Sequence, residues 1–299
     1  MDRISTIVLN YNDASTACGL AEELLGITCL DSVVLVDNCS TDDSWETLTA
    51  FADGRGRVSL LRSDKNGGYG SGNQLGIDWA VDRLGADYVI IANPDIHVTQ
   101  DCILGVKAAL DATQDCAMAS AQVMSPAGEP LFSYWMLLPL WKDLLDTGLV
   151  TRRLFKRMLN TPPEKLRQGG TSDCRLVDAV CGSFFMLRAD RFPAGEIHKV
   201  FDKNIFLYYE EKVLGQKLKS MGLKAVLAQN CSYVHAHSVS IDKSVKRIGD
   251  KQRLLHESKR YYYRKYLCAG PIKMACARAF LAVVLAEVRF LTQVCGMRW

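Results

Sequence analysis

The sequence predicts an α/β fold in which a Rossmann-like, mainly parallel sheet is flanked by helices and followed by a C-terminal helical extension. Three observations support this prediction. Apolar strand-like runs alternate with helix-like segments from Ser5 to Ala92, apolar patterning resumes after Asp173, and the chain ends in a basic segment and a mostly apolar helix. Such alternation is typical of sheets whose crossover helices cover both faces, and 299 residues with 48% hydrophobic content can bury a substantial core.

The expected elements follow the chain in order. In the first half we expect strands at Ser5–Asn10, Ser32–Asp37, Val58–Arg62 and Tyr88–Ala92, with helices from about Asp13 to Leu25, at Ser44–Phe51 and at Ser71–Leu84. Regularity weakens between about Ser125 and Asp173, which favours a mobile or substrate-facing insertion there. Later segments are expected at Leu176–Leu187, Phe201–Tyr209, Glu211–Met221, Lys224–Ala228 and from Pro271 to Trp299. The second half is therefore expected to complete the same domain.

Composition and end patterns exclude several classes of protein. The net charge of +3 is too small to indicate nucleic-acid binding, and no nucleic-acid motif is present. The eleven cysteines form no CxxC pair, so we expect reduced thiols and no disulfide framework. The N-terminus lacks the pattern of a secretory leader, which favours a cytoplasmic location. The longest late apolar run, Ala279–Ala286, is far below the roughly 20 residues of a membrane-spanning helix.

Polar residues directly follow three of the predicted strands. They are Asn10, Tyr11 and Asn12 after the first strand, Asp37 and Asn38 after the second, and Asn93 and Asp95 after the fourth. Ligands of open α/β sheets bind beyond the carboxyl ends of the strands. Helix caps and turns would explain any one of these loops, whereas three coincident loops favour a binding site.

Asp95 is the sharpest single candidate, because Pro94 keeps the backbone extended up to a carboxylate at the end of a buried strand. A hard oxygen ligand there suits Mg²⁺ or Mn²⁺ holding a diphosphate; the alternative is a turn whose Asp has no function. His235 and His237 lie two apart on an extended segment and share a face. Either could complete the metal site or contact a phosphate, and we expect only one of them to do so.

A glycine-rich segment runs from Asn66 to Asn73. Glycine-rich turns before helices bind phosphates through backbone amides. The glycine fingerprint of nicotinamide dinucleotide sites follows the first strand, whereas this segment follows the third strand and has Leu75 where the fingerprint has its third small residue. We therefore interpret the glycines, Gly67 among them, as a close-approach turn near a nucleotide. Asn66 and Asn73 are its candidate contacts.

Two adjacent carboxylates, Glu210 and Glu211, follow an apolar segment at the expected start of a helix. The simple explanation is an acidic first turn, which the helix dipole favours. The functional explanation is a general base that removes a proton from an acceptor hydroxyl, for which we choose Glu211. A partly apolar pocket would raise the pKa of Glu211 toward a useful range.

Together these motifs resemble the family 2 glycosyltransferases, inverting enzymes with the GT-A fold, and especially their rhamnosyltransferase-like bacterial branch. The resemblance covers roughly Ser5 to Ser240. It rests on VLNYN at 8–12, VDNCSTD at 36–42, NGGYG at 66–70 with Asn73, ANPD at 92–95, Gly182-Ser183, and FLYYEE at 206–211. It implies a GT-A catalytic domain at 1–240, with a nucleotide-binding half at 1–123 and an acceptor-binding half at 124–240, and an extension at 241–299.

The resemblance also implies roles on the donor side of the site. Asn12 and Asp37 would contact the base or ribose of the nucleotide. Asp95 would be the last acid of a DxD-like metal motif, and His235 or His237 would match a later histidine of the family.

On the acceptor side, the resemblance implies that Glu211 is the catalytic base and that Glu210, Gly182 and Ser183 bind the acceptor. Two positions depart from the family pattern. Glu211 stands in place of the commoner Asp, and Val213 stands where many members have another acid.

The implied reaction is inverting transfer of a sugar, rhamnose by analogy with the branch, from a donor such as dTDP-rhamnose or a UDP-sugar. The acceptor would be a glycan or a polyprenyl-diphosphate-linked glycan of a bacterial surface polysaccharide such as O-antigen. The alternatives are a nucleotidyltransferase, whose basic glycine-rich loop after the first strand is missing here, and a non-catalytic glycan-assembly protein on the same fold.

The basic residues gather in the extension. After residue 241, Lys and Arg outnumber Asp and Glu roughly three to one. From Lys259 to Tyr266 the cations are interleaved with tyrosines, and an apolar helix follows. This pattern favours either peripheral contact with the anionic inner face of a membrane, or packing on the catalytic domain or in a homodimer.

Overall fold

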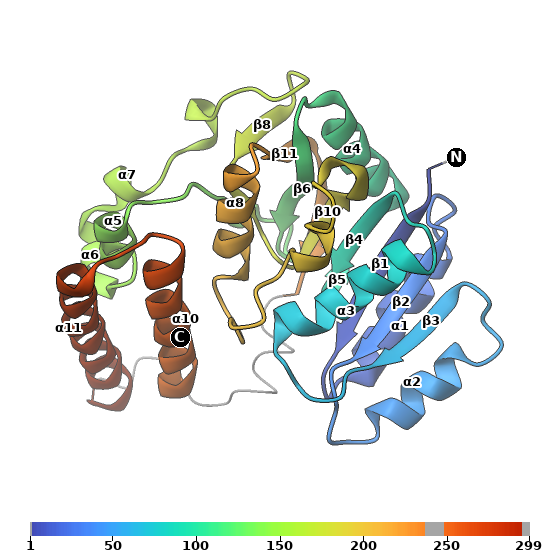
Figure 1. Ribbon diagram of the computed structural model, residues 1–299, viewed down its shortest axis with the longest axis horizontal. Helices are drawn as coiled ribbons and strands as arrows, with labels where there is room; N and C mark the ends of the chain where they lie inside the picture. The colour runs from blue at the N-terminus through green and yellow to red at the C-terminus, as the bar shows by residue number, and fades with distance from the viewer. Residues whose placement is uncertain (1, 237–247, 295–299) are drawn as a thin grey trace.

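The structure is a computed structural model that describes residues 2–236 and 248–294. Helices cover both faces of a central sheet, and α10 and α11 stand at one side beside α5, α6 and α7 (Figure 1). The strands are β1 (Ile4–Asn10), β2 (Ser32–Asp37), β3 (Val58–Arg62), β4 (Tyr88–Ala92), β5 (Ile96–His97), β6 (Cys116–Met124), β7 (Tyr134–Trp135), β8 (Cys174–Val177), β9 (Ala179–Val180), β10 (Phe184–Arg188) and β11 (Lys224–His235). The α-helices are α1 (Ala14–Leu25), α2 (Ser44–Ala52), α3 (Tyr69–Asp82), α4 (Gln100–Ala112), α5 (Leu140–Leu145), α6 (Leu149–Leu154), α7 (Lys156–Leu159), α8 (Glu210–Ser220), α10 (Ile248–Lys265) and α11 (Pro271–Arg289), which continues into a π-helical turn, η4 (Phe290–Val294).

The main sheet runs in the order β3-β2-β1-β4-β10-β6-β11-β5, with β8 paired beside β11. β1 is parallel to β2 and β4, β2 is parallel to β3, and β6 is parallel to β11. β10, β8 and β5 are antiparallel to their neighbours. The predicted α/β fold with a mainly parallel sheet is confirmed, and the second half of the chain completes this sheet by inserting β10 between β4 and β6.

Side chains of the central strands enter two cores, one on each face of the sheet, because successive residues point in opposite directions. In β4, Tyr88 and Ile90 join the core under α1 and α4. Val89 and Ile91 join the core under α3 and α8. Burial on both faces explains why these strands are continuous apolar runs.

The sequence pattern did not predict α4, β6 or the short helices after Ser125. The Thr99 side chain starts α4 by accepting a hydrogen bond from the Cys102 amide. β6 has the sequence CAMASAQVM, whose small residues carry a weak strand signal. α5, α6 and α7 are six, six and four residues long, which is too short to produce a readable helical period. The stretch expected to be irregular therefore contains short helices.

A buried charge cluster attaches α10 to the rest of the chain. Asp143 on α5 is almost fully buried and accepts hydrogen bonds from Lys212 (2.5 Å), Lys259 (3.0 Å) and the hydroxyls of Tyr209 (2.5 Å) and Tyr263 (2.7 Å). Burial by itself raises the pKa of Asp143, but the two lysines outweigh it and hold that pKa well below its ordinary value. The cluster joins α5, α8 and α10 in one buried network.

A second acid, Asp202, binds the end of α10. It accepts from Lys265 (2.7 Å) and from the hydroxyls of Tyr261 (3.0 Å) and Tyr266 (2.6 Å). Most of the basic, aromatic segment that could have faced a membrane therefore binds within the molecule through these side chains, as the packing alternative predicted.

Two further expectations concerned disulfide bonds and membrane-spanning helices. All ten cysteines in the described part of the chain are free, as expected, although Cys268 and Cys276 are exposed. None of the helices in residues 2–236 and 248–294 combines the length and apolarity needed to cross a membrane.

Candidate active site

The carboxyl ends of β1, β2 and β4 lie side by side, because β1 pairs with both of the other strands. Asn10 and Asp37 are register partners at the ends of β1 and β2. The Asn10 side-chain amide donates to Asp37 Oδ1 and to Ser40 Oγ, at 3.1 Å each. Asn93 follows β4 directly. The three polar loops thus form one edge of the sheet, as the strand pattern predicted.

Asp37 is completely buried at this edge. Its second oxygen accepts from the Ser40 amide at 3.2 Å and lies 3.4 Å from Arg62 Nε. Asn12 has a left-handed backbone (φ 55°), and its side-chain oxygen accepts from the Thr41 amide at 2.8 Å. Asp37 therefore fixes the loops at this edge through buried hydrogen bonds. The half-buried Tyr11 and Asn12 form the part of the edge that a ligand can reach.

The glycine-rich turn packs beside this edge. Asn66 Oδ1 accepts from Asn38 Nδ2 and from the Gly68 amide, both at 3.0 Å. Gly68 has φ 86°, and a Cβ there would lie 2.1 Å from the Phe206 carbonyl oxygen, so glycine is required. The turn, which includes the half-buried Gly67, makes its close approach to the backbone before α8.

Tyr69 joins the glycine-rich turn to the second half of the chain. Its hydroxyl donates to the Gly182 carbonyl at 2.6 Å, and burial, with Glu211 and Glu210 nearby, raises its pKa well above the ordinary value. Asn73 is buried one turn later, where its amide donates to the Tyr69 carbonyl at 3.0 Å. Tyr69 was not among the predicted site residues, although its position inside the NGGYG segment could have indicated it.

Asp95 and His235 come together from distant parts of the chain. β11 pairs with β5 so that His235 lies opposite Ile96, and the Ala236 amide donates to the Asp95 carbonyl at 3.0 Å. His235 Nε2 is 3.3 Å from Asp95 Oδ1, and the two side chains are only 9% and 6% exposed. Neighbouring ligands of an octahedral Mg²⁺ ion, with bonds of 2.0–2.1 Å, are about 3 Å apart. The pair therefore fits two positions around one divalent cation.

Further metal ligands would have to come from outside this pair. In residues 2–236 and 248–294, no group of three or more His, Cys, Asp or Glu side chains is arranged to hold a metal ion. The other predicted ligand, His237, lies outside the described residues. Mg²⁺ in enzymes that handle phosphates is commonly bound by one or two carboxylates, water and the phosphates of the substrate. The Asp95–His235 pair is compatible with such a partial protein shell.

α8 begins with the two predicted carboxylates, directly after a strained turn. Tyr208 and Tyr209 both have left-handed backbones, with φ of 69° and 76°. Such conformations cost non-glycine residues on the order of 1–3 kcal/mol each and persist where the surroundings hold them. The buried hydrogen bond from Tyr209 to Asp143 is one such restraint.

Burial changes the acidity of both carboxylates. It raises the pKa of Glu211, and hydrogen bonds from the backbone of Glu211 and Gly182 partly offset the effect. The pKa of Glu210 is raised well above its ordinary value by burial and by repulsion from Glu211. Gly182 lies against Glu211, since a Cβ on Gly182 would be 2.6 Å from Glu211 Oε1. A carboxyl group with a raised pKa is chemically suited to act as a general base.

Ser183 holds the loop that carries Asp95. Its carbonyl accepts from the Asn93 amide at 2.8 Å, and its hydroxyl is hydrogen-bonded to the buried Tyr233 hydroxyl at 2.7 Å. This places Ser183 in a supporting position, next to the direct contact that Gly182 makes with Glu211.

One cavity of about 540 Å³ brings together predicted residues from both halves of the chain. The predicted residues that line it are Asn93, Gly182, Ser183, Glu210, Glu211 and His235. Its walls also include five residues that were not predicted as site residues: Phe132, Trp135, Arg152, Lys212 and Lys259. The nucleotide-side candidates from Asn10 to Asn73 lie outside this lining, so the candidate site extends from the cavity along the edge of the sheet.

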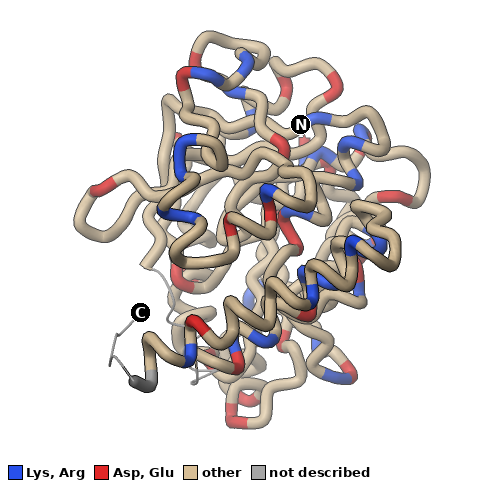
Figure 2. Tube along the Cα trace, turned by 90° about the vertical axis from the view of Figure 1, so that its left-hand side faces the viewer, with Lys and Arg blue, Asp and Glu red and all other residues tan. Residues whose placement is uncertain are grey.

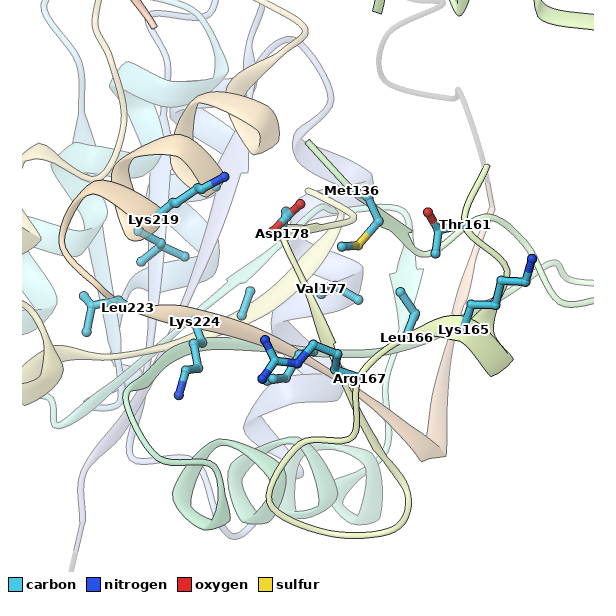
Figure 3. A pocket seen from close by; sticks show the side chains of 14 residues that line it. Met136, Thr161, Lys165, Leu166, Arg167, Val177, Asp178, Lys219, Leu223 and Lys224 are labelled. Atoms are coloured by element: carbon cyan, nitrogen blue, oxygen red, sulfur yellow. The ribbon is translucent and has the colours of Figure 1, made fainter. Parts of the chain in front are cut away.

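A second cavity of about 320 Å³ lies beyond the other end of α8 and contains none of the predicted residues. Figure 3 shows its apolar side chains, such as Leu166 and Val177, with Lys165, Lys219 and Lys224 around them. The ammonium groups of these lysines point in different directions (Figure 3). They do not converge on one position where an anion could bind.

Comparison with known proteins points to one enzyme family. Residues 5–175 match the family described as "Glycosyl transferase family 2". The chain is 23% identical over 211 residues to the "Low-salt glycan biosynthesis hexosyltransferase Agl10" of Haloferax volcanii, a match that covers 71% of this chain and 60% of that protein. The chain thus spans less than two thirds of the length of this curated relative.

Solved structures support the fold. The mannosyltransferase PcManGT from Pyrobaculum calidifontis, in complex with GDP-Man and Mn²⁺, is 14% identical with a TM-score of 0.56, covering 99% of this chain and 76% of that one. Glucosyl-3-phosphoglycerate synthase from Mycobacterium tuberculosis, in complex with Mn²⁺, UDP and glucosyl-3-phosphoglycerate, is 10% identical with a TM-score of 0.52, covering 90% and 82%. At such identities the likeness concerns the fold alone, which is the GT-A fold.

Proposed function

Because the chain belongs to glycosyl transferase family 2, we propose that it transfers a hexose from a nucleoside-diphosphate sugar to a hydroxyl group of a glycan or lipid-linked glycan. One observation carries this proposal. Glu211, Asn93 and His235 line the same cavity, and Asp95 lies 3.3 Å from His235. A candidate base and a candidate metal site therefore border one space. The hexosyltransferase name of the relative, and the GDP-Man, UDP and Mn²⁺ of the structural neighbours, support a nucleotide-sugar donor.

Glu211 is the proposed general base. It accepts the proton of the acceptor hydroxyl while that oxygen attacks the anomeric carbon of the donor. A new glycosidic bond forms, the bond to the diphosphate oxygen breaks, and the configuration at the anomeric carbon inverts. The raised pKa of Glu211 supports this role, because proton transfer is most efficient when the pKa of the base approaches the working pH.

Asp95 and His235 are the proposed metal ligands, and His237 is a further candidate. A bound Mg²⁺ or Mn²⁺ would neutralise charge that develops on the departing nucleoside diphosphate. Residues of the polar edge, from Asn10 to Asn12 and around Asp37, would bind the nucleotide. dTDP-rhamnose and UDP-sugars are the first donors to test.

The walls of the cavity suggest the kind of acceptor. Phe132 is 52% exposed and stands edge-on to Trp135, with ring centroids 5.1 Å apart. Aromatic faces of this kind can pack against a sugar ring. The cations of this cavity are already paired, Lys212 and Lys259 with Asp143 and Arg152 with Asp146, so the aromatic wall is the feature that supports a glycan acceptor. A polyprenyl-diphosphate-linked glycan of a bacterial surface polysaccharide is the acceptor we propose to test first. The corresponding location is the cytoplasm, at the inner face of the cell membrane.

Calorimetric titration of nucleoside diphosphates and their sugars, with Mg²⁺, with Mn²⁺ and without metal, tests the donor side. We expect metal-dependent binding that is lost in Asp95→Ala and strongly weakened in His235→Ala. Absence of binding by the unmodified protein under all these conditions would refute the proposal. Release of pyrophosphate from a nucleoside triphosphate and a sugar phosphate would instead indicate a nucleotidyltransferase.

Glu211→Gln tests the base, because it keeps the size of the side chain and removes its proton affinity. We expect normal donor binding with transfer reduced by about 10²–10⁴-fold. Glu129→Gln, which makes the same change at an exposed residue outside the cavity, is the matched control and should keep the activity. Normal turnover by Glu211→Gln would remove this residue from the mechanism, and retained anomeric configuration in the product would exclude a single displacement.

A further inference from the structure

Helix α11 carries an apolar stripe on its exposed side as well as on its buried side, although Lys273, Arg278 and Arg289 are also exposed. Its buried residues are Met274, Ala277, Leu281, Val284 and Val288. Its exposed side, continued by the first residue of η4, carries Ala275, Ala279, Ala282, Val283, Ala286 and Phe290. Val283 and Phe290 are 67% and 56% exposed. A helix on a water-exposed surface normally has a polar outer face, and one that is apolar all round is normally covered.

A second exposed segment contains both cationic and large apolar residues. Residues 152–158, with the sequence RRLFKRM, are all exposed. Leu154 is 73% exposed, and Val150, one helical turn earlier, is 66% exposed. The sequence contains no acidic residue between Asp146 and Glu164. Arg152 is paired with Asp146 at 3.3 Å. The segment therefore combines large apolar side chains with three further cations, Arg153, Lys156 and Arg157, and has no acidic residue of its own.

The two features belong to one surface, because α6 packs on the end of α11. The Leu149 and Val150 amides donate to the Glu287 carboxylate at 3.3 and 3.2 Å. These bonds satisfy two amides at the N-terminus of α6. Val283 and Phe290 lie four residues before and three after Glu287, and so on its side of the helix. We call the exposed side of α11, Val150 and residues 152–158 the α6–α11 surface.

The α6–α11 surface adjoins the candidate active site. Leu149, Arg152 and Val288 of the same helices line the 540 Å³ cavity. Figure 2 faces this side of the molecule, and the helix that leads to the C-terminus is tan along most of its length. Of the residues of α11, only Lys273, Arg278, Glu287 and Arg289 are charged.

We infer that the α6–α11 surface binds an anionic lipid bilayer and places the cavity beside it. The apolar side chains would enter the headgroup boundary, while the cations meet anionic headgroups. A second copy of the chain fits less well, since a twofold contact centred on residues 152–157 would bring these cations close to those of the partner. The inference rests on the proposed function in one respect: an acceptor with a lipid tail would then reach the cavity from the bilayer.

Sedimentation of the full chain with vesicles tests this inference without any substrate. We expect binding to vesicles of phosphatidylglycerol and phosphatidylcholine in equal parts, little binding to phosphatidylcholine alone, and release by high salt. Arg153→Glu with Lys156→Glu should weaken binding at least roughly thirtyfold, from about 1 kcal/mol for each cation near the surface. Arg83→Glu with Lys219→Glu makes the same charge change on exposed residues elsewhere and should have little effect.

A second pair of variants tests whether apolar side chains insert into the bilayer. Leu154→Gln should weaken vesicle binding, whereas Leu104→Gln on α4, where the side chain is 42% exposed, should not. Absent binding to the anionic vesicles, or equal losses in the two variants of either pair, would overturn the inference. So would a monomer–dimer equilibrium that shifts in Leu154→Gln, because it would identify a protein interface.

The assay also separates this inference from the proposed function. Metal-dependent nucleotide binding should be unchanged in Arg153→Glu with Lys156→Glu, while transfer to an acceptor embedded in vesicles falls. Loss of vesicle binding with intact nucleotide binding thus concerns the surface alone. Vesicle binding by a chain that binds no nucleotide would refute the proposed function and leave the surface assignment standing.

Discussion

Gly182→Ala should reduce catalysis while leaving the fold almost unchanged. A Cβ at position 182 would lie 2.6 Å from Glu211 Oε1. Because non-bonded heavy atoms settle near 3.5 Å, the carboxylate oxygen has to retreat by roughly 1 Å. The atom that moves is the end of a flexible side chain, so we expect a cost of less than about 1 kcal/mol in the free energy of unfolding.

A displacement of 1 Å is large for a proton-transfer step. Misplacing a reacting group by this distance can lower the rate about 10²-fold, and the donor side of the site, around Asp95 and His235, is not altered. We therefore expect kcat for sugar transfer to fall about 100-fold in Gly182→Ala, with an unchanged dissociation constant for the nucleoside diphosphate.

The control is Gly56→Ala, because a Cβ at that position meets no atom within 4 Å. Steady-state kinetics, nucleotide titration and thermal unfolding of both variants complete the test. The reasoning fails if Gly182→Ala keeps the wild-type kcat. It also fails if the variant loses activity only in proportion to the fraction that is unfolded.

Three further predictions concern stability. Asp143→Ala leaves Lys212 and Lys259 buried without their shared counter-charge, so urea denaturation should show a loss of about 3–5 kcal/mol; a loss below about 1 kcal/mol would contradict the role of this cluster. The pKa of Glu210 is higher in the folded state than in the unfolded state, so the protonated carboxyl group favours folding. This contribution to the free energy of unfolding is complete below the ordinary pKa of 4.5 and is lost as the pH rises through the folded-state pKa. Glu210→Gln should accordingly raise Tm at pH 7 but not at pH 4, and an equal gain at both would exclude this cause. Gly68→Ala, with a Cβ 2.1 Å from a carbonyl oxygen, should destabilise the fold by more than about 2 kcal/mol and clearly more than Gly54→Ala, which shares the positive φ in open space.

Local patterns were sufficient for the first half of the sheet. Apolar runs bounded by polar loops located β1, β2, β3 and β4 to within a residue. β1, β2 and β4 are buried along almost their whole length and are therefore mostly apolar, while the edge strand β3 is half-buried. The same logic failed for β6, whose small residues pack well in the interior but resemble several kinds of segment. It also failed for α5, α6 and α7, which are stabilised by packing and not by their own length.

The sequence by itself determined the candidates, because each is marked by a local pattern. Asn10 and Asp37 end apolar strands, Asp95 follows one, and Glu211 lies in the first turn of a helix. Only the tertiary structure decided which candidates meet. β11 carries His235 to Asp95, and Gly182 lies against Glu211, through contacts between residues far apart in the chain. The burial of Lys259 and Tyr263 against Asp143 is of the same kind. A periodic pattern records which face of an element is buried, but it holds no information about which distant side chain will cover that face.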